Sequence, residues 1–227
     1  MRATLTGWRD LAPAVRHFEF EAEAPVEFLP GQFISLTAEL EGLAITRAYS
    51  LASAPDGSRF SLCLNRVSDG HMSPHLFAMN VGGAVEFKGP LGGFTIRNPD
   101  RERVYVATGT GVAPFRSMLE QQFATGAGTP VTLVFGVRYA ETILYRDEFE
   151  RWALEHPCFD FRPTLSRPGP EWTGRAGHVQ SHAIETIGGR RDLDIYICGL
   201  KLMVDDMRAR LKELGFERRQ IITEKYD

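Results

Sequence analysis

Glycine, serine, arginine and cysteine residues stand directly after several strands that the sequence predicts. The segment Thr108–Met118 places Gly109 and Gly111 between a buried strand and a helix. Glycines let the backbone approach a ligand closely, and a helix N-terminus offers N–H groups and a positive dipole end to a phosphate. A plain tight turn is the alternative, because Ala113 and Pro114 occupy the place of the third glycine of Gly-x-Gly-x-x-Gly.

Two further strand ends carry residues that could meet a nucleotide. Ser166 and Arg167 follow one strand, with Arg175 a little further along the chain. A planar guanidinium makes paired hydrogen bonds to phosphate oxygens, although solvated loop arginines are the alternative interpretation. Cys198 and Gly199 follow another strand. A single cysteine there is more often a packing residue than a chemical one.

The segment Arg47–Ser53 is a different kind of candidate site. Alternation along a strand places Arg47 and Tyr49 on one face and Ala48 and Ser50 on the other. An arginine and an aromatic ring that project together could hold a phosphate and a flat ring system. An ordinary strand with one exposed face is the alternative.

The first hundred residues read as short strands separated by Gly and Pro. A small antiparallel barrel or sandwich is typical of this pattern. A short helix interrupts it at Ser73–Met79, with Ser73 as N-cap and Pro74 in the first turn. The expected strands are Val15–Glu21, Gln32–Thr37, Phe60–Val67 and Ala84–Lys88, and the strand set ends near Phe94–Ile96.

After residue 97 the pattern changes to strands that alternate with helices. This alternation predicts a mainly parallel sheet covered by helices on both faces, whose ligands bind beyond the carboxyl ends of the strands. We therefore expect two domains, an antiparallel β-barrel over 1–97 and an α/β domain over 98–227. The strands expected in the second domain are Arg103–Thr108, Val131–Gly136, Phe159–Leu165, Asp194–Cys198 and Gln220–Glu224.

The composition excludes several classes of protein. The chain has 227 residues, 43% apolar and 24% charged, which is typical of a globular protein and excludes disorder. Its longest apolar runs, Val104–Ala107 and Val131–Phe135, are far shorter than the ~18 residues that span a bilayer, so we expect no membrane insertion. A net charge of −3 gives no basic surplus for nucleic acid.

The cysteines, the histidines and the first residues restrict the possible chemistry and location further. Cys63, Cys158 and Cys198 are far apart and odd in number, which argues against a disulfide framework or a four-cysteine iron–sulfur cluster. Two histidine pairs spaced four residues apart lack a third ligand, so we expect no metal site. The first eight residues lack the apolar stretch of a secretory signal, and we expect a cytoplasmic protein.

Taken together, these segments resemble the ferredoxin–NADP reductase superfamily of flavoproteins, over essentially the whole chain. The resemblance rests on six segments in a fixed order, and the short spacing between them is most similar to the bacterial-type reductases. They are Arg47–Ser50, Asp69–Pro74, Gly89–Gly92, Gly109–Pro114, Cys198–Lys201 and Glu224–Asp227.

For the first domain the resemblance implies an FAD site. Arg47 would pair with the flavin pyrophosphate, Tyr49 would pack on the isoalloxazine ring, and Ser50 would hydrogen-bond near N5. A Gly-x-x-Ser turn would present backbone N–H groups and a hydroxyl to the same pyrophosphate, which favours FAD over FMN. Other positions that match the family's flavin site are Ala48, Leu64, Asn65, Gly70, His71, Met72, Ser73 and, in the second domain, Thr110 and Tyr226.

For the second domain the resemblance implies an NADP(H) site. Cys198 would lie beside the nicotinamide and Tyr226 would stack over the other face of the flavin. Hydride would pass between nicotinamide C4 and flavin N5, with Ser50, Cys198 and Glu224 shaping the contact. The residues that match the family's nucleotide site are Gly109, Thr110, Gly111, Arg138, Ser166, Arg167, Arg175, Cys198 and Gly199.

The acceptor is not specified by these residues. We expect a monomer that exchanges electrons between NADPH and a separate ferredoxin or flavodoxin. An NADH-dependent reductase of an oxygenase system is an alternative, because Trp172–Val179 also resembles a loop of such enzymes. A free-flavin reductase would tend to lack the turn at Gly70–Ser73. A non-catalytic electron-transfer subunit is disfavoured by the presence of Ser50, Cys198 and Tyr226.

Overall fold

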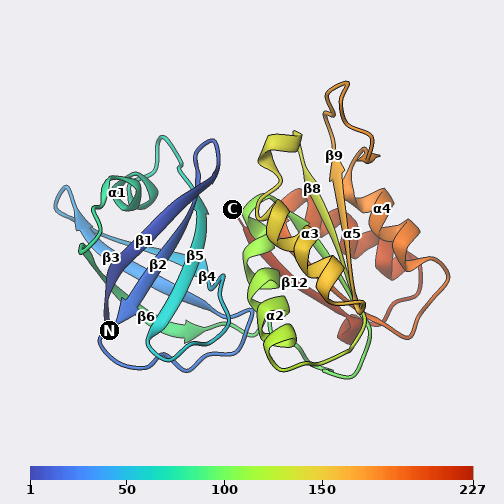
Figure 1. Ribbon diagram of the computed structural model, residues 1–227, viewed down its shortest axis with the longest axis horizontal. Coiled ribbons are helices and arrows are strands. Elements are labelled where there is room, and N and C mark those ends of the chain that lie inside the picture. Colours follow the sequence, from blue (N-terminus) through green and yellow to red (C-terminus); the bar gives the residue numbers. More distant parts are fainter. Residues whose placement is uncertain (227) are drawn as a thin grey trace. The chain divides into compact units, whose positions relative to one another are not determined.

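The computed structural model describes residues 1–226, and the contacts within it divide the chain into two compact units (Figure 1). The barrel unit consists of Met1–Ile96 together with Ala113–Ala124. The parallel-sheet unit consists of Arg97–Val112 and residues 125–226. A helix that follows the first strand of the second unit along the chain therefore groups with the first unit.

Six antiparallel strands form the sheet of the barrel unit, in the order β4-β3-β6-β1-β2-β5. Beyond the end of β4, Leu51 bridges Leu62 of β5, and the Ala52 N–H donates a hydrogen bond to the Ser61 carbonyl at 2.8 Å. These contacts join the two ends of the sheet, which closes it into the antiparallel barrel that the sequence predicts. The strands are β1 Arg2–Ala12, β2 Val15–Ala22, β3 Phe33–Leu40, β4 Leu43–Ser50, β5 Arg59–Asn65 and β6 Ala84–Leu91.

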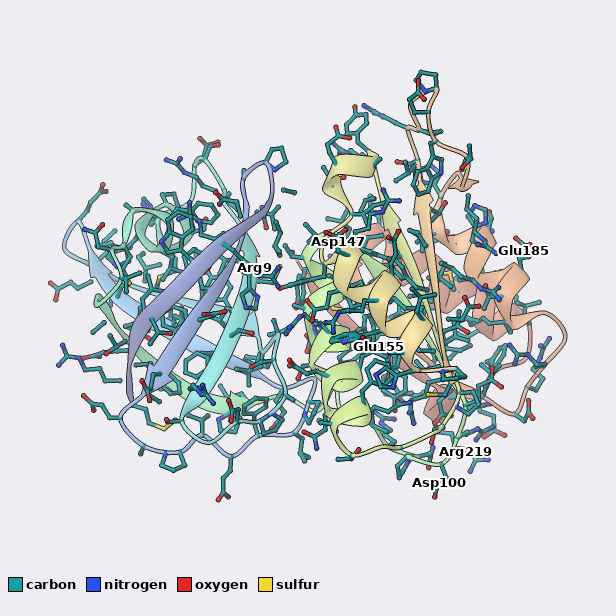
Figure 2. The ribbon with its side chains drawn as sticks, viewed as in Figure 1. Arg9, Asp100, Asp147, Glu155, Glu185 and Arg219 are labelled. Carbon is teal, nitrogen blue, oxygen red and sulfur yellow. The ribbon has the colours of Figure 1, made fainter. Side chains whose placement is uncertain are left out.

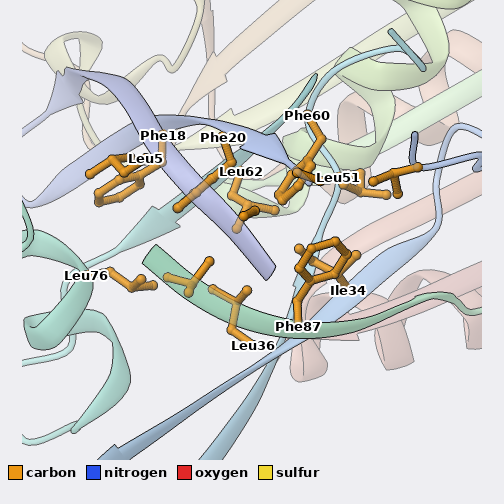
Figure 3. Packing of buried hydrophobic residues seen from close by; sticks show 14 of the residues in the cluster. Leu5, Phe18, Phe20, Ile34, Leu36, Leu51, Phe60, Leu62, Leu76 and Phe87 are labelled. Carbon is orange, nitrogen blue, oxygen red and sulfur yellow. The ribbon is translucent and has the colours of Figure 1, made fainter. Parts of the chain in front are cut away.

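Alternate residues of these strands build the barrel core (Figure 3). On β2, Phe18 and Phe20 are buried in the core, and Phe20 stacks on Phe60 of β5 with 5.5 Å between ring centroids. Phe60 also packs against Phe87 of β6 at 5.3 Å. Removal of these aromatic rings from water supplies the main driving force for closing the barrel.

Two local predictions in this unit are wrong. The short helix α1 spans Met72–Ala78 and starts before Ser73, so Ser73 is not its N-cap. The Ser73 hydroxyl instead accepts a hydrogen bond from the Val67 N–H at 2.9 Å. The strands end at Leu91, not near Phe94–Ile96. Phe94 lies beyond the last strand, and its buried ring packs edge-on against Phe115, with 5.7 Å between centroids.

The second unit contains a six-stranded sheet in the order β10-β9-β8-β7-β11-β12, and every neighbouring pair is parallel. This sheet and the helices around it confirm the predicted α/β class. Its central strands, β7 and β11, are buried along nearly their whole length, as expected for strands covered on both faces. The strands are β7 Arg103–Thr108, β8 Val131–Val137, β9 Phe159–Leu165, β10 Arg175–Ala176, β11 Asp194–Leu200 and β12 Ile221–Tyr226.

Helices cover both faces of the parallel sheet (Figure 1). On one face α3, Arg146–Glu155, places Phe149 against Phe161 of β9 with 5.2 Å between centroids. Figure 2 shows its Asp147 and Glu155 near opposite ends of this helix. On the other face α4, Val179–Ile187, and α5, Lys201–Glu213, pack on Val104, Val106 and Ile197. Single 3₁₀ turns occur at Gly109–Val112, Ala140–Thr142 and Arg218–Gln220.

The strand order creates a switch point between β7 and β11. The chain runs from β7 to β8 to β9 in one direction and then returns to place β11 on the opposite side of β7. Connections leave to either side of such a point, which opens a crevice beyond the carboxyl ends of the two strands, and ligands of open α/β sheets bind there. The residues after β7 and at the end of β11 are therefore the first place to look for a nucleotide site.

Candidate cofactor and active site

Strand β4 presents the candidate residues of the barrel unit. Its antiparallel pairing sets Arg47 opposite Leu36 and Tyr49 opposite Ile34, so Arg47 and Tyr49 share one face as the alternation predicts. The Arg47 side chain is exposed and donates to the neighbouring Thr46 carbonyl at 2.8 Å. Ala48 is also exposed. This strand end thus offers a solvent-facing guanidinium beside an aromatic ring.

Tyr49 and Ser50 lie deeper than Arg47. The Tyr49 ring packs against the barrel core, and burial raises the pKa of its hydroxyl to about 12, with the Arg47 charge opposing that rise. The phenol therefore stays neutral across the physiological range. Ser50 is 6% exposed and faces away from Tyr49 along the strand.

Strand β5 and the turn before α1 supply the remaining candidates of this unit. Leu64 belongs to the barrel core, so only its main chain can line a ligand site, whereas Asn65 is exposed. In the turn, the Gly70 N–H donates to the Val67 carbonyl at 3.0 Å, and His71 is exposed. Met72 is part of the core. The turn is thus fixed by Val67 and Ser73, with His71 at its surface.

At the switch point, the main chain of the turn after β7 lies very close to the main chain at the end of β11. A Cβ on Gly111 would lie 2.5 Å from the Cys198 carbonyl oxygen and 2.7 Å from the Gly199 Cα. Gly199 has φ +145°, and a Cβ there would lie 2.1 Å from the Thr108 hydroxyl oxygen. That same hydroxyl oxygen accepts a hydrogen bond from the Leu200 N–H at 3.2 Å. Only glycines permit the loops after β7 and at the end of β11 to meet this closely.

The two residues that precede Gly111 are more accessible than Gly111 itself. Gly109 is exposed with φ +53°, and a Cβ placed on it would meet nothing within 4 Å. Thr110 is half-buried. The turn therefore keeps one wall packed on β11 and leaves the other open.

Cys198, Glu224 and Tyr226 lie close together in the structure. Parallel pairing of β11 with β12 sets Cys198 beside Glu224 and Leu200 beside Tyr226. The Cys198 thiol is fully buried, and this burial, reinforced by the Glu224 charge, raises its pKa well above the ordinary value. A hydrogen bond with the Tyr226 side chain acts in the opposite direction. The sulfur is thus a neutral thiol rather than a thiolate nucleophile.

The main chains that carry the arginines after β8 and β9 are hydrogen-bonded to each other. The Ser166 N–H donates to the Val137 carbonyl at 2.9 Å, and the Arg167 N–H donates to the Arg138 carbonyl at 3.0 Å. Both arginine side chains are exposed and Ser166 is half-buried. Two guanidinium groups on main chains that are hydrogen-bonded to each other suit a phosphate group.

Arg175 lies on the short strand β10, next to β9. The indole N–H of Trp172 donates to the Arg175 carbonyl at 2.8 Å, and the Trp172 ring lies so close to Gly174 that a Cβ there would approach it at 2.5 Å. The bulky ring thus fixes the main chain of Arg175. No three histidine, cysteine or acidic side chains gather as metal ligands within residues 1–226.

Family models match both parts of the chain. An oxidoreductase FAD-binding domain matches residues 2–96, and an oxidoreductase NAD-binding domain matches residues 105–209. A ferredoxin–NADP reductase B from Sorangium cellulosum is 41% identical over 99% of this chain and 97% of its own length. The chain belongs to the ferredoxin–NADP reductase superfamily. As a member of this superfamily it is a flavoprotein oxidoreductase, and the predicted flavin and nicotinamide cofactors are confirmed at the level of the two domain families.

Other relatives of this reductase are larger proteins. The electron transfer component of toluate 1,2-dioxygenase from Pseudomonas putida is 30% identical over 88% of this chain but 59% of its own length. The crystal structure of a cytochrome P450 reductase from Amycolatopsis superposes with a TM-score of 0.89 at 30% identity, covering 99% of this chain and 69% of that one. No helix in residues 1–226 of the reductase is long and apolar enough to cross a membrane.

The residues of the reductase fit both cofactors. FAD carries a pyrophosphate and a flat ring system, which match the exposed guanidinium of Arg47 and the ring of Tyr49 on one face of β4. A nicotinamide dinucleotide needs close approach of its pyrophosphate to a main chain, which suits the exposed main chain at Gly109. The contact of Gly111 with Cys198 and Gly199 holds that turn against β11.

Sequence reasoning missed several residues that support these sites. Thr108 had no assigned role, although its hydroxyl holds the Leu200 N–H at the switch point. Three polar residues of helix α2, Ala113–Ala124, bind the segment after β4. These four hydrogen bonds leave no periodic pattern in the sequence, because each joins residues that are 64 or more positions apart in the chain.

Proposed function

We propose that this flavoprotein transfers electrons between NADPH and a separate one-electron carrier, a ferredoxin or a flavodoxin. The observation that carries the proposal is the switch point, where Gly111 packs on Cys198 and Gly199 beside the buried thiol, Glu224 and Tyr226. The 41% identity to a relative named ferredoxin–NADP reductase, over 97% of its length, supports the assignment as a reductase of this kind.

On the flavin side, the proposed roles follow from side-chain chemistry. Arg47 binds the pyrophosphate, the neutral ring of Tyr49 packs on the isoalloxazine, and Ser50 hydrogen-bonds near its N5. The turn at Gly70–Ser73 contributes main-chain N–H groups, while Ala48, Leu64 and Asn65 line the remainder. These assignments suit an exposed cation beside a half-buried aromatic ring.

On the nucleotide side, the turn Gly109–Gly111 and Gly199 receive the pyrophosphate of NADPH. Arg138, Ser166, Arg167 and Arg175 receive the 2′-phosphate, since an exposed pair of guanidinium groups favours a doubly charged ligand over the two hydroxyls of an NADH ribose.

The catalytic contribution of the protein is positional. When bound, the two cofactors supply hydride transfer between nicotinamide C4 and flavin N5 and one-electron chemistry at the flavin. The neutral thiol of Cys198 lies beside the nicotinamide as a small, uncharged group, and Glu224 places a negative charge near that thiol. Tyr226 covers the flavin and yields when the nicotinamide enters. Thr110 belongs to the turn that receives the nucleotide pyrophosphate and also lies near the flavin. Ser50 completes the contact by binding near N5.

An NADH-dependent reductase of an oxygenase system is the second candidate. The specific observation in its favour is 30% identity over 88% of this chain to the electron transfer component of toluate 1,2-dioxygenase. The chain covers 59% of that protein's own length.

The cofactor test begins with purification. We expect a yellow protein with bound FAD that NADPH reduces faster than NADH. A colourless protein that turns over added FMN would overturn the proposal in favour of a free-flavin reductase. Rates with purified ferredoxin, flavodoxin and an oxygenase component, compared at equal concentration, then identify the class of acceptor.

The nucleotide test uses Arg167→Ala, with Arg151→Ala as its matched control. Arg151 is an exposed arginine of α3 outside the site. Loss of a charge-assisted hydrogen bond should raise the KM for NADPH by roughly tenfold to a hundredfold while the KM for NADH changes little. An equal effect on both nucleotides would remove the 2′-phosphate assignment and favour the NADH-dependent alternative.

We place the boundary between the two sequence domains at residues 97 and 98, and we propose a cytoplasmic monomer. Light scattering of the purified protein at two concentrations tests whether it is a monomer. Fractionation of the source cells tests whether it is cytoplasmic.

A further inference from the structure

The segment Leu51–Ala54 directly follows the strand that carries Tyr49 and Ser50, and β5 holds it on one side. Leu51 bridges Leu62, the Ala52 N–H donates to the Ser61 carbonyl at 2.8 Å, and the Ser61 N–H donates to the Ser53 hydroxyl at 3.0 Å. These contacts close the barrel, but they leave the Ala52 and Ser53 carbonyls and the Ala54 N–H to other partners.

Helix α2 supplies those partners, within the same unit. Arg116 Nη1 donates to the Ala52 carbonyl, the Ser117 hydroxyl donates to the Ser53 carbonyl, and Glu120 Oε2 accepts from the Ala54 N–H, each at 2.6 Å. Three consecutive residues of the segment are therefore each bound by a different side chain of one helix. Two of these bonds involve a charged group, which makes them stronger than hydrogen bonds between neutral groups.

The charges in this contact are themselves balanced. Arg116 is 8% exposed, and its guanidinium lies 3.4 Å from the Glu120 carboxylate that binds Ala54. Packing alone would not need such a pair, because burying a guanidinium carries a desolvation cost that apolar side chains avoid. Directional hydrogen bonds from these three side chains fix the position of the segment along the helix as well as its distance from the helix.

We propose that Arg116, Ser117 and Glu120 are positioning residues that hold the end of β4, and through it the Tyr49 ring and the Ser50 hydroxyl, in the geometry that the flavin requires. Ala52 lies two residues beyond Ser50 along the same extended chain, so a shift of its carbonyl moves the Ser50 side chain. This inference rests on the proposed function, which places the flavin against Tyr49 and Ser50.

Chain order gives the arrangement a second role. α2 begins at Ala113, directly after the turn Gly109–Val112 that the proposed function assigns to the nucleotide. One helix thus begins where the nucleotide turn ends, and its side chains bind the segment that follows the strand carrying Tyr49 and Ser50. A displacement of α2 would change both sites together.

The test uses Ser117→Ala, which removes one hydroxyl, and Val85→Ala as a control matched for loss of stability. Val85 is a barrel-core residue on β6 and does not contact the segment through any of the bonds above. For the FAD-bound protein we expect Ser117→Ala to change the visible absorption bands and midpoint potential of the flavin. The rate of hydride transfer should fall by roughly tenfold or more, with the KM for NADPH nearly constant. Val85→Ala should lower the melting temperature without these changes.

A second variant keeps the test decisive if Ser117→Ala does not fold. Glu120→Gln retains an oxygen that can accept from the Ala54 N–H but removes the charge facing Arg116, and it should cause a smaller shift in the same flavin properties. Ser181→Ala, an exposed serine on α4, should behave as the unmodified protein. Unchanged absorption and potential in both α2 variants would overturn the inference.

Ser50→Ala separates this inference from the proposed function. A changed flavin spectrum in Ser50→Ala, together with unchanged spectra in the α2 variants, would refute only the positioning role. An unchanged spectrum in Ser50→Ala would refute the placement of the flavin itself.

Discussion

In the barrel unit, the candidate cofactor residues are side chains on β4, a strand with one exposed face, whereas in the parallel-sheet unit the central contact is made by main chain. Arg47 and Tyr49 project from a strand that main-chain pairing holds to β3. Gly111 and Gly199 have no side chain, and the structure forms only because they lack one. Substitutions should therefore separate binding from folding in the first unit and damage both together in the second.

The largest effect is expected at Gly199. Gly199→Ala would place a Cβ 2.1 Å from the Thr108 hydroxyl oxygen in a backbone with φ +145°. We expect the free energy of unfolding to fall by about 2–4 kcal/mol, with loss of nucleotide binding. Urea unfolding followed by circular dichroism measures this. Gly128→Ala is the control, because a Cβ there meets nothing within 4 Å, and an equal cost for the two variants would show that the close approach is unimportant.

The next effect concerns pH and belongs to the barrel unit alone. Burial, together with the charges of Arg116 and Arg9, lowers the pKa of His17 from 6.5 to about 3. Between those two values the unfolded chain binds a proton that the folded chain does not. The contribution of neutral, buried His17 to stability is therefore fully present above pH 6.5. It is lost as the pH falls toward 3, by up to ~1.4 kcal/mol per pH unit.

His17→Gln tests this assignment. Between pH 6 and 4 the unfolding free energy of the variant should fall less steeply than that of the unmodified protein. The difference in slope should be ~1.4 kcal/mol per pH unit, which corresponds to one bound proton. Urea titrations at several pH values give that slope. An unchanged slope would mean that other groups carry the acid sensitivity of this unit.

A smaller effect is expected at Tyr49. Tyr49→Ala should weaken FAD binding by roughly tenfold because a stacking ring is lost, whereas Tyr49→Phe should retain most of the affinity. Fluorescence titration of the apoprotein with FAD measures the dissociation constants. If Tyr49→Ala unfolds the barrel instead of weakening FAD binding, the contrast between the two units fails.

The smallest effect is expected at Asp205. The pair between Asp205 and Lys225 joins α5 to β12 at 2.6 Å, but both side chains are substantially exposed. Water and salt screen such a pair, although the Lys225 hydrogen bond lowers the pKa of Asp205. Asp205→Asn should leave the melting temperature unchanged within error, and a clear drop would show that this edge of the parallel sheet depends on side chains.

The sequence predicts the parallel-sheet unit better than the barrel. Its two central strands are buried runs with a glycine at or directly after their ends, and the predicted class of fold is confirmed. The structure also sets Cys198 beside Glu224. In the barrel, β1 was missed because its register shifts between Leu5 and Gly7 and again between Asp10 and Ala12, which breaks the alternation that marks a strand. Phe94 looks like a strand residue because it is apolar, yet it is buried by α2.

The polar contacts of α2 could not have been predicted in the same way. Arg116, Ser117 and Glu120 lie on a helix whose buried positions surround it on most sides, and nothing local distinguishes them from a solvated face. Their partners are main-chain atoms of residues that any sequence could supply. Only the three-dimensional structure pairs them with Ala52, Ser53 and Ala54.

The grouping of α2 with the barrel has a consequence for recombining these reductases. A chimera that joins the first 97 residues of this chain to the nucleotide domain of a relative would pair the barrel with a foreign helix at positions 113–124. The exchangeable module is therefore discontinuous in the gene: residues 113–124 should travel with the first domain. A library built on that discontinuous boundary should yield more flavin-retaining hybrids than one cut at a single point.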